Sequence, residues 1–219
     1  MKLNKKLSCI ASMIEKGKNV IDVGCDHALL DIFLTLYNEN HCIASDIKKS
    51  AIEGAFRNLK KYKVEDKVTL VVSDGFHNIP IRTHETIVIS GMGTATILNI
   101  MKQIPYDKVD KVIISSNNDL KELRYYMMNN NFIIQQELVV CENHIFYVII
   151  EFGKGTAHYN EKELQYGPIL LKQRSIDRDS YYHYLITINN EIIRKLPSKS
   201  IGKKFKLWKE NLFLKHNSK

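Results

Sequence analysis

The stretch NVIDVGCDHALL, residues 19–30, decides the fold of this chain. Its apolar first half ends at Gly24, which is the pattern of a buried strand that turns into a helix beside a bound nucleotide. A dinucleotide site would place two more glycines after Gly24, but this chain has Cys25, Asp26 and His27 there. The motif therefore predicts a glycine turn whose ligand tolerates a carboxylate and an imidazole where a pyrophosphate would otherwise lie.

Strand-like and helix-like segments alternate after an N-terminal helix, which is typical of parallel β-α-β units. The predicted strands cover residues 20–23, 42–45, 68–73, 86–90 and 109–115, and the predicted helices cover residues 28–37, 50–61, 96–103 and 119–129. Two more strands, residues 132–140 and 145–152, are separated only by CENH, which is too short for a parallel crossover. The sequence therefore predicts an α/β fold, a Rossmann-like sheet of parallel strands closed by an antiparallel hairpin.

The last third of the chain carries nearly all of its net charge of +8. Residues 156–219 contain 13 Lys and Arg against 6 Asp and Glu, and residues 1–155 contain 19 against 18. Apolar residues at three- and four-residue steps predict two amphipathic helices here, with Pro197 and Gly202 bracketing the turn. We predict a domain over residues 1–155 and a basic, coiled-coil-like helical hairpin over residues 156–219 that binds a polyanion. The lysines expected to contact it are Lys195, Lys199, Lys203, Lys204, Lys206 and Lys209.

The composition excludes several other classes of protein. No apolar run approaches the roughly 18 residues of a membrane-spanning helix. The four cysteines lie at wide, unrelated spacings without a C-x-x-C pair, which argues against a disulfide framework and against a zinc site. We expect a cytoplasmic protein that binds neither a membrane nor a metal ion.

Small and polar residues follow every predicted parallel strand, where ligands of an open parallel sheet collect. Asp46 lies 22 residues after Gly24, a spacing that predicts hydrogen bonds to ribose hydroxyls, although an Asp here also caps helices. Asp74 and Gly75 fit an acceptor for an adenine amino group or an ordinary turn. His27 is either a site residue or a packing residue. The predicted cofactor-binding residues are Gly24, Asp26, His27, Asp46, Ile47, Asp74, Gly75, Gly91, Met92 and Gly93.

Charge separates the possible nucleotide ligands. The carboxylate of Asp26 would repel a pyrophosphate, and the glycine turn SGMGT at residues 90–94 lacks the Lys-Ser/Thr of a triphosphate loop. S-adenosylmethionine carries adenosine without a phosphate, together with a sulfonium and an ammonium group. The loop is therefore predicted to bind S-adenosylmethionine rather than NAD or FAD.

The blocks DVGCDHALL, ASDI, SDGF, ISGMGT and NNDLKELR, in this order, resemble the bacterial tRNA (adenine(22)-N1)-methyltransferase family over residues 4–155. YGPILLK, residues 166–172, is similar to the start of that family's C-terminal hairpin. The resemblance implies a class I S-adenosylmethionine-dependent methyltransferase that modifies N1 of an adenine in the D-arm region of tRNA. The chain departs from the family pattern at Asp31, where the family has proline, and at residues 115–117, where the family has Gln-Pro-Asn.

Within this hypothesis Asp26 is the expected catalytic residue, and His27 and Asn117 orient the adenine. A small-molecule methyltransferase and a non-catalytic RNA-binding protein are the alternatives. The first leaves the basic tail unexplained, and the second leaves the acids at the strand ends without a role. The oligomeric state stays open, with a monomer as the expectation.

Overall fold

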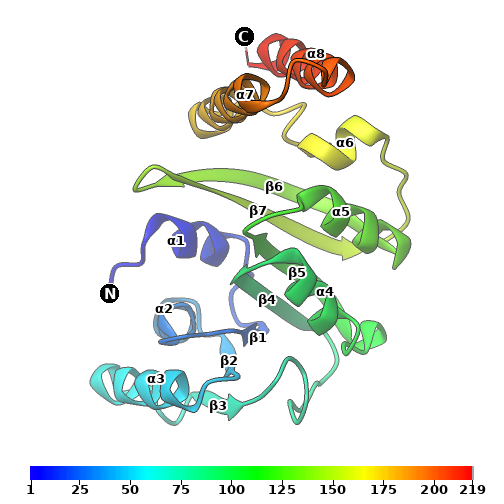
Figure 1. The fold of residues 1–219 in the computed structure, drawn as a ribbon. Coiled ribbons are helices and arrows are strands. Elements are labelled where there is room, and N and C mark those ends of the chain that lie inside the picture. Colours follow the sequence, from blue (N-terminus) through cyan, green and yellow to red (C-terminus); the bar gives the residue numbers. More distant parts are fainter. Residues whose placement is uncertain (219) are drawn as a thin grey trace.

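The computed structural model of the chain describes residues 1–218, which form one seven-stranded sheet flanked by helices (Figure 1). The strands are β1 (Asn19–Val23), β2 (His41–Asp46), β3 (Val68–Val72), β4 (Glu85–Met92), β5 (Val109–Ser116), β6 (Phe132–Glu142) and β7 (Ile145–Lys154). Their order across the sheet is β3-β2-β1-β4-β5-β7-β6. The first five strands pair in parallel, and β7 pairs antiparallel with both β5 and β6. The predicted Rossmann-like sheet with a closing hairpin is confirmed.

One helix precedes the sheet, helices connect β1 to β2, β2 to β3, β4 to β5 and β5 to β6, and three more follow the sheet. They are α1 (Lys5–Ser12), α2 (Leu29–Tyr37), α3 (Lys49–Tyr62), α4 (Thr94–Met101), the short 3-10 helix η1 (Tyr106–Lys108), α5 (Leu120–Asn129), α6 (Glu161–Tyr166), α7 (Ile176–Lys195) and α8 (Ile201–Asn217). The predicted α/β elements agree with the observed ones to within two residues at each end. None of the helices in residues 1–218 is both long and apolar enough to cross a membrane.

The two faces of the sheet bury separate apolar cores, because successive strand residues point to opposite faces. Ile21 and Ile87 pack on the face covered by α4 and α5. Val20 and Val88 pack on the face covered by α1, α2 and α3. The same alternation sends Asp22 to the second face, beside α1 and α2, where it is buried.

The turn between β6 and β7 is tighter than expected. The strands continue to Glu142 and Ile145, so the connection has two residues rather than four. These residues, Asn143 and His144, have φ values of 50° and 63°. Positive φ at both central positions is typical of a type I′ turn, whose twist matches that of the adjoining strands.

A buried ion pair joins the sheet to the segment that follows it. Arg124 of α5 donates from Nε to the Oε1 atom of Glu137 on β6 at 2.7 Å, and both side chains are buried. Arg124 Nη1 also donates to the Leu164 carbonyl at 2.9 Å, and Glu137 Oε2 accepts from the Ile169 amide at 3.0 Å. A Cβ on Gly167 would lie 2.5 Å from Glu137 Oε2, so the YGPILLK block needs its glycine at this contact.

Side chains from the C-terminal segment also bind the backbone of β6. The Tyr159 hydroxyl accepts from the Ile134 amide at 2.9 Å, and Asp177 Oδ2 accepts from the Cys141 amide at 3.0 Å. At the same end of β6, the Glu142 carboxylate accepts from the Lys5 amide of α1 at 2.8 Å. Residues 159–177 are therefore packed against the sheet.

The predicted helical hairpin is present, and α7 and α8 lie side by side beyond the β6 end of the sheet (Figure 1). Two details differ from the expectation. Gly202 lies inside α8 rather than in the turn, and the predicted strand over residues 145–152 continues to Lys154 as β7. Leu214 and Asn211 of α8 are buried against α7, where Asn211 exchanges hydrogen bonds with Asn189 and Asn190.

Candidate active site

A cavity of about 580 Å³ lies at the carboxyl ends of β1, β2 and β4. The strand order reverses between β1 and β4, and open parallel sheets bind their ligands at that position. Seven of the predicted cofactor-binding residues line this cavity. They are Gly24, Asp26, His27, Asp46, Ile47, Gly91 and Met92.

Gly24 turns the chain at the end of β1. Its φ is +85°, and a Cβ at this position would lie 2.1 Å from the terminal methyl carbon of Met92. A side chain at residue 24 is therefore excluded by both the backbone and the contact with β4. Asp26 and Ala28, two and four residues later, also have left-handed φ values of 50° and 54°. The loop holds a strained conformation, which is frequent at functional sites.

Asp46 connects the two loops that form the cavity wall. Its Oδ2 accepts from the Asp26 amide at 3.3 Å, and its Oδ1 accepts from the Lys48 amide at 2.9 Å. A carboxylate has about four lone-pair positions, so it can keep these bonds and also accept from the hydroxyls of a bound ribose.

His27 lies at the rim of the cavity against α3. Its Nε2 is 3.7 Å from Asp26 Oδ1, and its side chain is 57% exposed. A Cβ on Gly54 would lie 3.0 Å from His27 Nδ1, and Asn58 Nδ2 donates to the His27 carbonyl at 3.0 Å. The imidazole is thus packed on one side and open on the other.

Four predicted site residues lie beside the cavity rather than in its wall. The Ser73 amide donates to the Asp46 carbonyl at 3.0 Å, which places the turn at Asp74 and Gly75 next to Asp46. Gly93 follows Met92 and precedes α4. Asn117 Nδ2 donates to the Gly91 carbonyl at 3.0 Å, so Asn117 holds the carboxyl end of β4 in place.

The N-terminal helix contributes residues that the sequence pattern did not indicate. Asn4 and Lys6 line the cavity together with Asp22. Lys6 Nζ would lie 3.4 Å from a Cβ on Gly91, and burial lowers the pKa of Lys6 despite the charges of Asp22 and Glu142. An ammonium group and a carboxylate thus face the same cavity. The apolar periodicity of α1 predicted its helix but carried no signal for its place on the sheet.

Asp22 and Asp31 form a buried carboxyl pair beneath the cavity. Asp31 is 0% exposed, and neither of its carboxylate oxygens has a hydrogen-bond donor from another residue among residues 1–218. Burial raises the pKa of Asp31 well above its usual range, and the charge of Asp22 raises it further. Burial also raises the pKa of Asp22 to about 7, against the hydrogen bond from Asp31 and the charge of Lys6. The pair holds a proton, which lets Asp31 donate to Asp22.

This pair makes stability depend on pH. Between about pH 4 and pH 7, the folded chain keeps a proton that an unfolded aspartate has released, so the unfolding free energy falls as pH rises. Asp31→Asn supplies a neutral donor of the same shape and removes part of this penalty. We expect it to raise the unfolding free energy at pH 8 by about 1–3 kcal/mol, or the melting temperature by about 2–10 °C.

Thermal melts of the wild type and of Asp31→Asn at pH 5 and pH 8 measure the effect. The gain is expected to be small at pH 5, where Asp31 is already neutral. Asp26→Asn is the matched control, because the Asp26 side chain is 76% exposed and lies outside the buried carboxyl pair. Parallel melting curves for wild type and Asp31→Asn at both pH values would contradict the shared proton.

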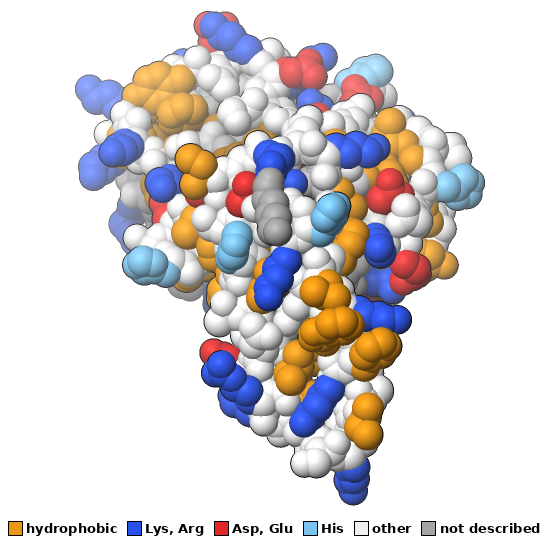
Figure 2. Space-filling view, turned by 90° about the horizontal axis from the view of Figure 1, so that it is seen from above, with side chains coloured by type: hydrophobic (Ala, Val, Ile, Leu, Met, Phe, Trp, Pro, Cys, Tyr) orange, Lys and Arg blue, Asp and Glu red, His pale blue; other side chains and the backbone are white. Residues whose placement is uncertain are grey.

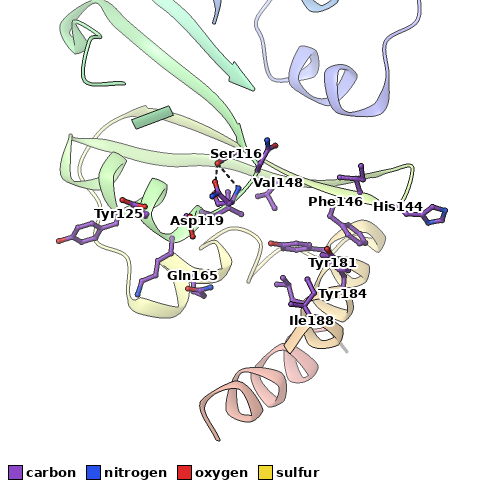
Figure 3. A pocket seen from close by; sticks show the side chains of 17 residues that line it. Ser116, Asp119, Tyr125, His144, Phe146, Val148, Gln165, Tyr181, Tyr184 and Ile188 are labelled. Atoms are coloured by element: carbon purple, nitrogen blue, oxygen red, sulfur yellow. Dashed lines mark hydrogen bonds between the residues drawn. The ribbon is translucent and has the colours of Figure 1, made fainter. Parts of the chain in front are cut away.

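A second cavity of about 790 Å³ lies between the end of β5, the start of α5, the β6–β7 turn and α7 (Figure 3). Asn117 lines it and donates to the carbonyl of Gly91, which lines the first cavity, so one hydrogen bond joins the walls of the two cavities. Tyr125, Phe146, Tyr181 and Tyr184 contribute aromatic surface, and Phe146 lies 5.3 Å from Tyr184 between ring centroids. This cavity lies where the sheet meets the C-terminal helices.

Comparisons with known proteins agree with this geometry. A family model described as a methyltransferase domain matches residues 3–150. A Mycoplasma genitalium protein named "Putative tRNA methyltransferase" is 33% identical over 69% of this chain and 70% of its own length. The tRNA (adenine(22)-N(1))-methyltransferase of Bacillus subtilis is 26% identical over 80% of this chain and 77% of its own length. The solved structure of M. capricolum TrmK with S-adenosyl-homocysteine covers 100% of this chain and 98% of its own, with a TM-score of 0.86 and 25% identity.

Proposed function

This chain belongs to the methyltransferase-domain family, and from that premise we propose that it methylates N1 of adenine 22 in tRNA with S-adenosylmethionine as the methyl donor. The observation that carries the proposal is the charge of the cavity at the switch point of the sheet. Asp22, Asp26 and Asp46 line it together with Lys6. A nucleoside with a cationic, zwitterionic tail suits this set of charges, whereas a pyrophosphate would meet three carboxylates.

The residues present fit S-adenosylmethionine. Asp46 would accept hydrogen bonds from its ribose hydroxyls, and the neighbouring turn at Asp74 and Gly75 would contact the adenine. The Asp22 carboxylate and the Lys6 ammonium face the same cavity and complement the amino and carboxyl groups of a methionine tail. When bound, the cofactor supplies a methyl group on a sulfonium, which a nucleophile can accept directly.

The target base needs little chemical activation. N1 of adenine has a lone pair and no proton at neutral pH, so no base has to deprotonate it before methylation. The methylated ring is cationic, and a nearby carboxylate stabilises the charge that develops on it. Asp26 lies at the cavity rim with an exposed side chain and serves this role, with His27 and Asn117 orienting the base.

The substrate has to present an unpaired adenine edge. N1 takes part in base pairing, so the adenine leaves its stack before methyl transfer. We assign the grip on the tRNA backbone to residues 156–219, where six exposed or half-exposed lysines lie on α7, α8 and the turn between them. They are Lys195, Lys199, Lys203, Lys204, Lys206 and Lys209. We place the boundary between the catalytic domain and this tRNA-binding segment at residue 156.

Mapping the modified nucleotide tests the function. Purified protein is incubated with S-adenosylmethionine and a tRNA transcript, and the RNA is digested and analysed by mass spectrometry. We expect N1-methyladenosine at position 22 and none in a transcript with guanine there. Methylation of a small molecule but not of tRNA would support the small-molecule alternative. Absence of S-adenosylmethionine binding in calorimetry would support a non-catalytic RNA-binding protein.

Asp26→Ala tests the catalytic assignment. We expect the rate of methyl transfer to fall by about 100-fold, which is typical of losing a positioned charged group, while S-adenosylmethionine still binds. Single-turnover methylation of the tRNA transcript measures the rate, and calorimetry measures cofactor affinity. Asp66→Ala is the control, because Asp66 is an exposed carboxylate outside this cavity. A near wild-type rate in Asp26→Ala would show that Asp26 is not the catalytic carboxylate.

A further inference from the structure

The outer face of α8 presents an apolar stripe to solvent. Ile201, Phe205, Trp208 and Leu212 follow one another at steps of four, three and four residues, which places them on one side of a helix. Their exposed fractions are 73%, 52%, 51% and 47%. Contacts with α7 are made by a different side of α8, through the buried residues Asn211 and Leu214. The stripe is therefore not needed to hold the hairpin together.

Two aromatic rings form the centre of this stripe. The rings of Phe205 and Trp208 are stacked, with their centroids 5.8 Å apart and their planes 18° apart. The ammonium group of Lys209 lies 4.5 Å from the centroid of Phe205. Phe205 therefore lies between Trp208 and a cation, and the half-exposed Trp208 is the aromatic side chain most open to a ligand. Single-stranded nucleic acids bind exposed aromatic rings that have cations nearby by stacking their bases on them.

The charge around the stripe selects among possible partners. α8 carries five lysines and one acidic residue, Glu210. Figure 2, which looks onto the C-terminal helices, shows hydrophobic side chains lying between Lys and Arg side chains on the projecting end of the molecule. A second copy of this chain would bring a like-charged surface against this one, which disfavours self-association. A polyanion with exposed apolar faces is complementary in both charge and polarity.

We propose that the outer face of α8 binds unpaired bases of the tRNA, which stack on Trp208, backed by Phe205, while the neighbouring lysines contact the adjacent phosphates. This inference rests on the proposed function and adds base contacts to a hairpin otherwise assigned to the backbone. Unpaired loop nucleotides are the substrate feature that such a surface recognises, because every base presents a π-face.

The native chain provides the reporter, since Trp208 is its single tryptophan. Fluorescence titration with a tRNA transcript is expected to quench the tryptophan emission and to reduce its accessibility to acrylamide, with the same midpoint as filter binding. Trp208→Ala is expected to weaken tRNA binding about tenfold and Trp208→Phe less than threefold, both with an unchanged dependence on salt. Lys206→Ala is the contrasting variant, and it is expected to reduce the salt dependence by about one counterion.

Several results would overturn the inference. Unchanged emission at saturating tRNA, or unchanged affinity in Trp208→Ala, would show that bases do not stack there. Emission that changes with protein concentration alone, with a dimer in sedimentation velocity, would make the stripe a self-association surface. If the wild type methylates tRNA while Trp208 stays silent, only this inference fails. If the protein neither binds nor methylates tRNA, the proposed function fails with it.

Discussion

Replacing Arg124 with alanine is expected to lower the unfolding free energy by about 3–5 kcal/mol, the largest stability effect of a single substitution that we anticipate in this chain. Arg124 and Glu137 have side chains that are 1% and 0% exposed. Removing the guanidinium leaves the Glu137 carboxylate buried without its cation. It also leaves the Leu164 carbonyl without its donor. In the folded state, the carboxylate and the carbonyl then have neither water nor a protein donor as a hydrogen-bond partner.

The buried pair also holds the C-terminal segment against the sheet, so removing it is expected to affect that whole segment. Arg124 belongs to α5 and Glu137 to β6, while their remaining hydrogen bonds go to residues 164–170. We therefore expect Arg124→Ala to loosen α6 and the helical hairpin before the sheet unfolds. Urea unfolding followed by circular dichroism measures the free energy, and hydrogen exchange locates the loss of protection.

An exposed ion pair between α5 and α6 provides the control. Lys121 of α5 pairs with Glu161 of α6, and their side chains are 43% and 80% exposed. Lys121→Ala is expected to change stability by less than about 1 kcal/mol, because surface pairs contribute little. The double substitution of Arg124→Met with Glu137→Leu removes the uncompensated charge and is expected to recover part of the lost stability. The recovery is incomplete because the Leu164 carbonyl and the Ile169 amide still lack their partners. A loss below about 1 kcal/mol in Arg124→Ala would contradict the role of the buried pair.

Replacing Asp46 with alanine is expected to reduce S-adenosylmethionine affinity by at least about 100-fold. Two hydrogen bonds from ribose hydroxyls to a carboxylate contribute about 1.5–3 kcal/mol each, and alanine removes both. The same change removes the acceptor for the Asp26 and Lys48 amides, so both loops of the cavity wall lose a support. Isothermal titration calorimetry with S-adenosylmethionine measures the affinity.

Two variants separate ligand contact from loop support. Asp46→Asn keeps one oxygen for a backbone amide but loses the charge, so we expect an intermediate affinity. Glu65→Ala removes an exposed carboxylate that does not line the cavity and is expected to bind S-adenosylmethionine as the wild type does. An Asp46→Ala affinity within threefold of the wild type would contradict the ribose assignment.

Much of the fold could be predicted because its signals are local. The apolar run before Gly24 and the alternation of strands with helices fix a parallel sheet, and four residues between two strands exclude a crossover. Which side of α8 faces the solvent could not be predicted in this way. An apolar stripe at helical spacing normally marks a buried face. Here the buried side of α8 contains Leu214 together with Asn211, whose polar side chain gives no periodic signal.

The residues of the cavity wall could likewise be predicted only where their signal in the sequence is local. Residues after each strand, such as Gly24 and Asp46, were predicted because the topology of a parallel sheet brings strand ends together. Lys6 was not, since its place depends on where α1 docks, and that is set by a contact between Lys5 and Glu142 that spans 137 residues of sequence. Asp22 lay within a strand and Asp31 within a helix. Their pairing can be recognised only when it is known which face of β1 carries Asp22 and which side of α2 carries Asp31.

The hydrogen bonds of Tyr159 and Asp177 to β6 have a consequence for the solubility of the chain. β6 has a strand neighbour on one side only, and the amides on its other side are where a foreign strand would add. Ile134 and Cys141 already donate to these two side chains. The C-terminal segment therefore shields the open border of the sheet, and a chain shortened before Tyr159 would expose a template for aggregation.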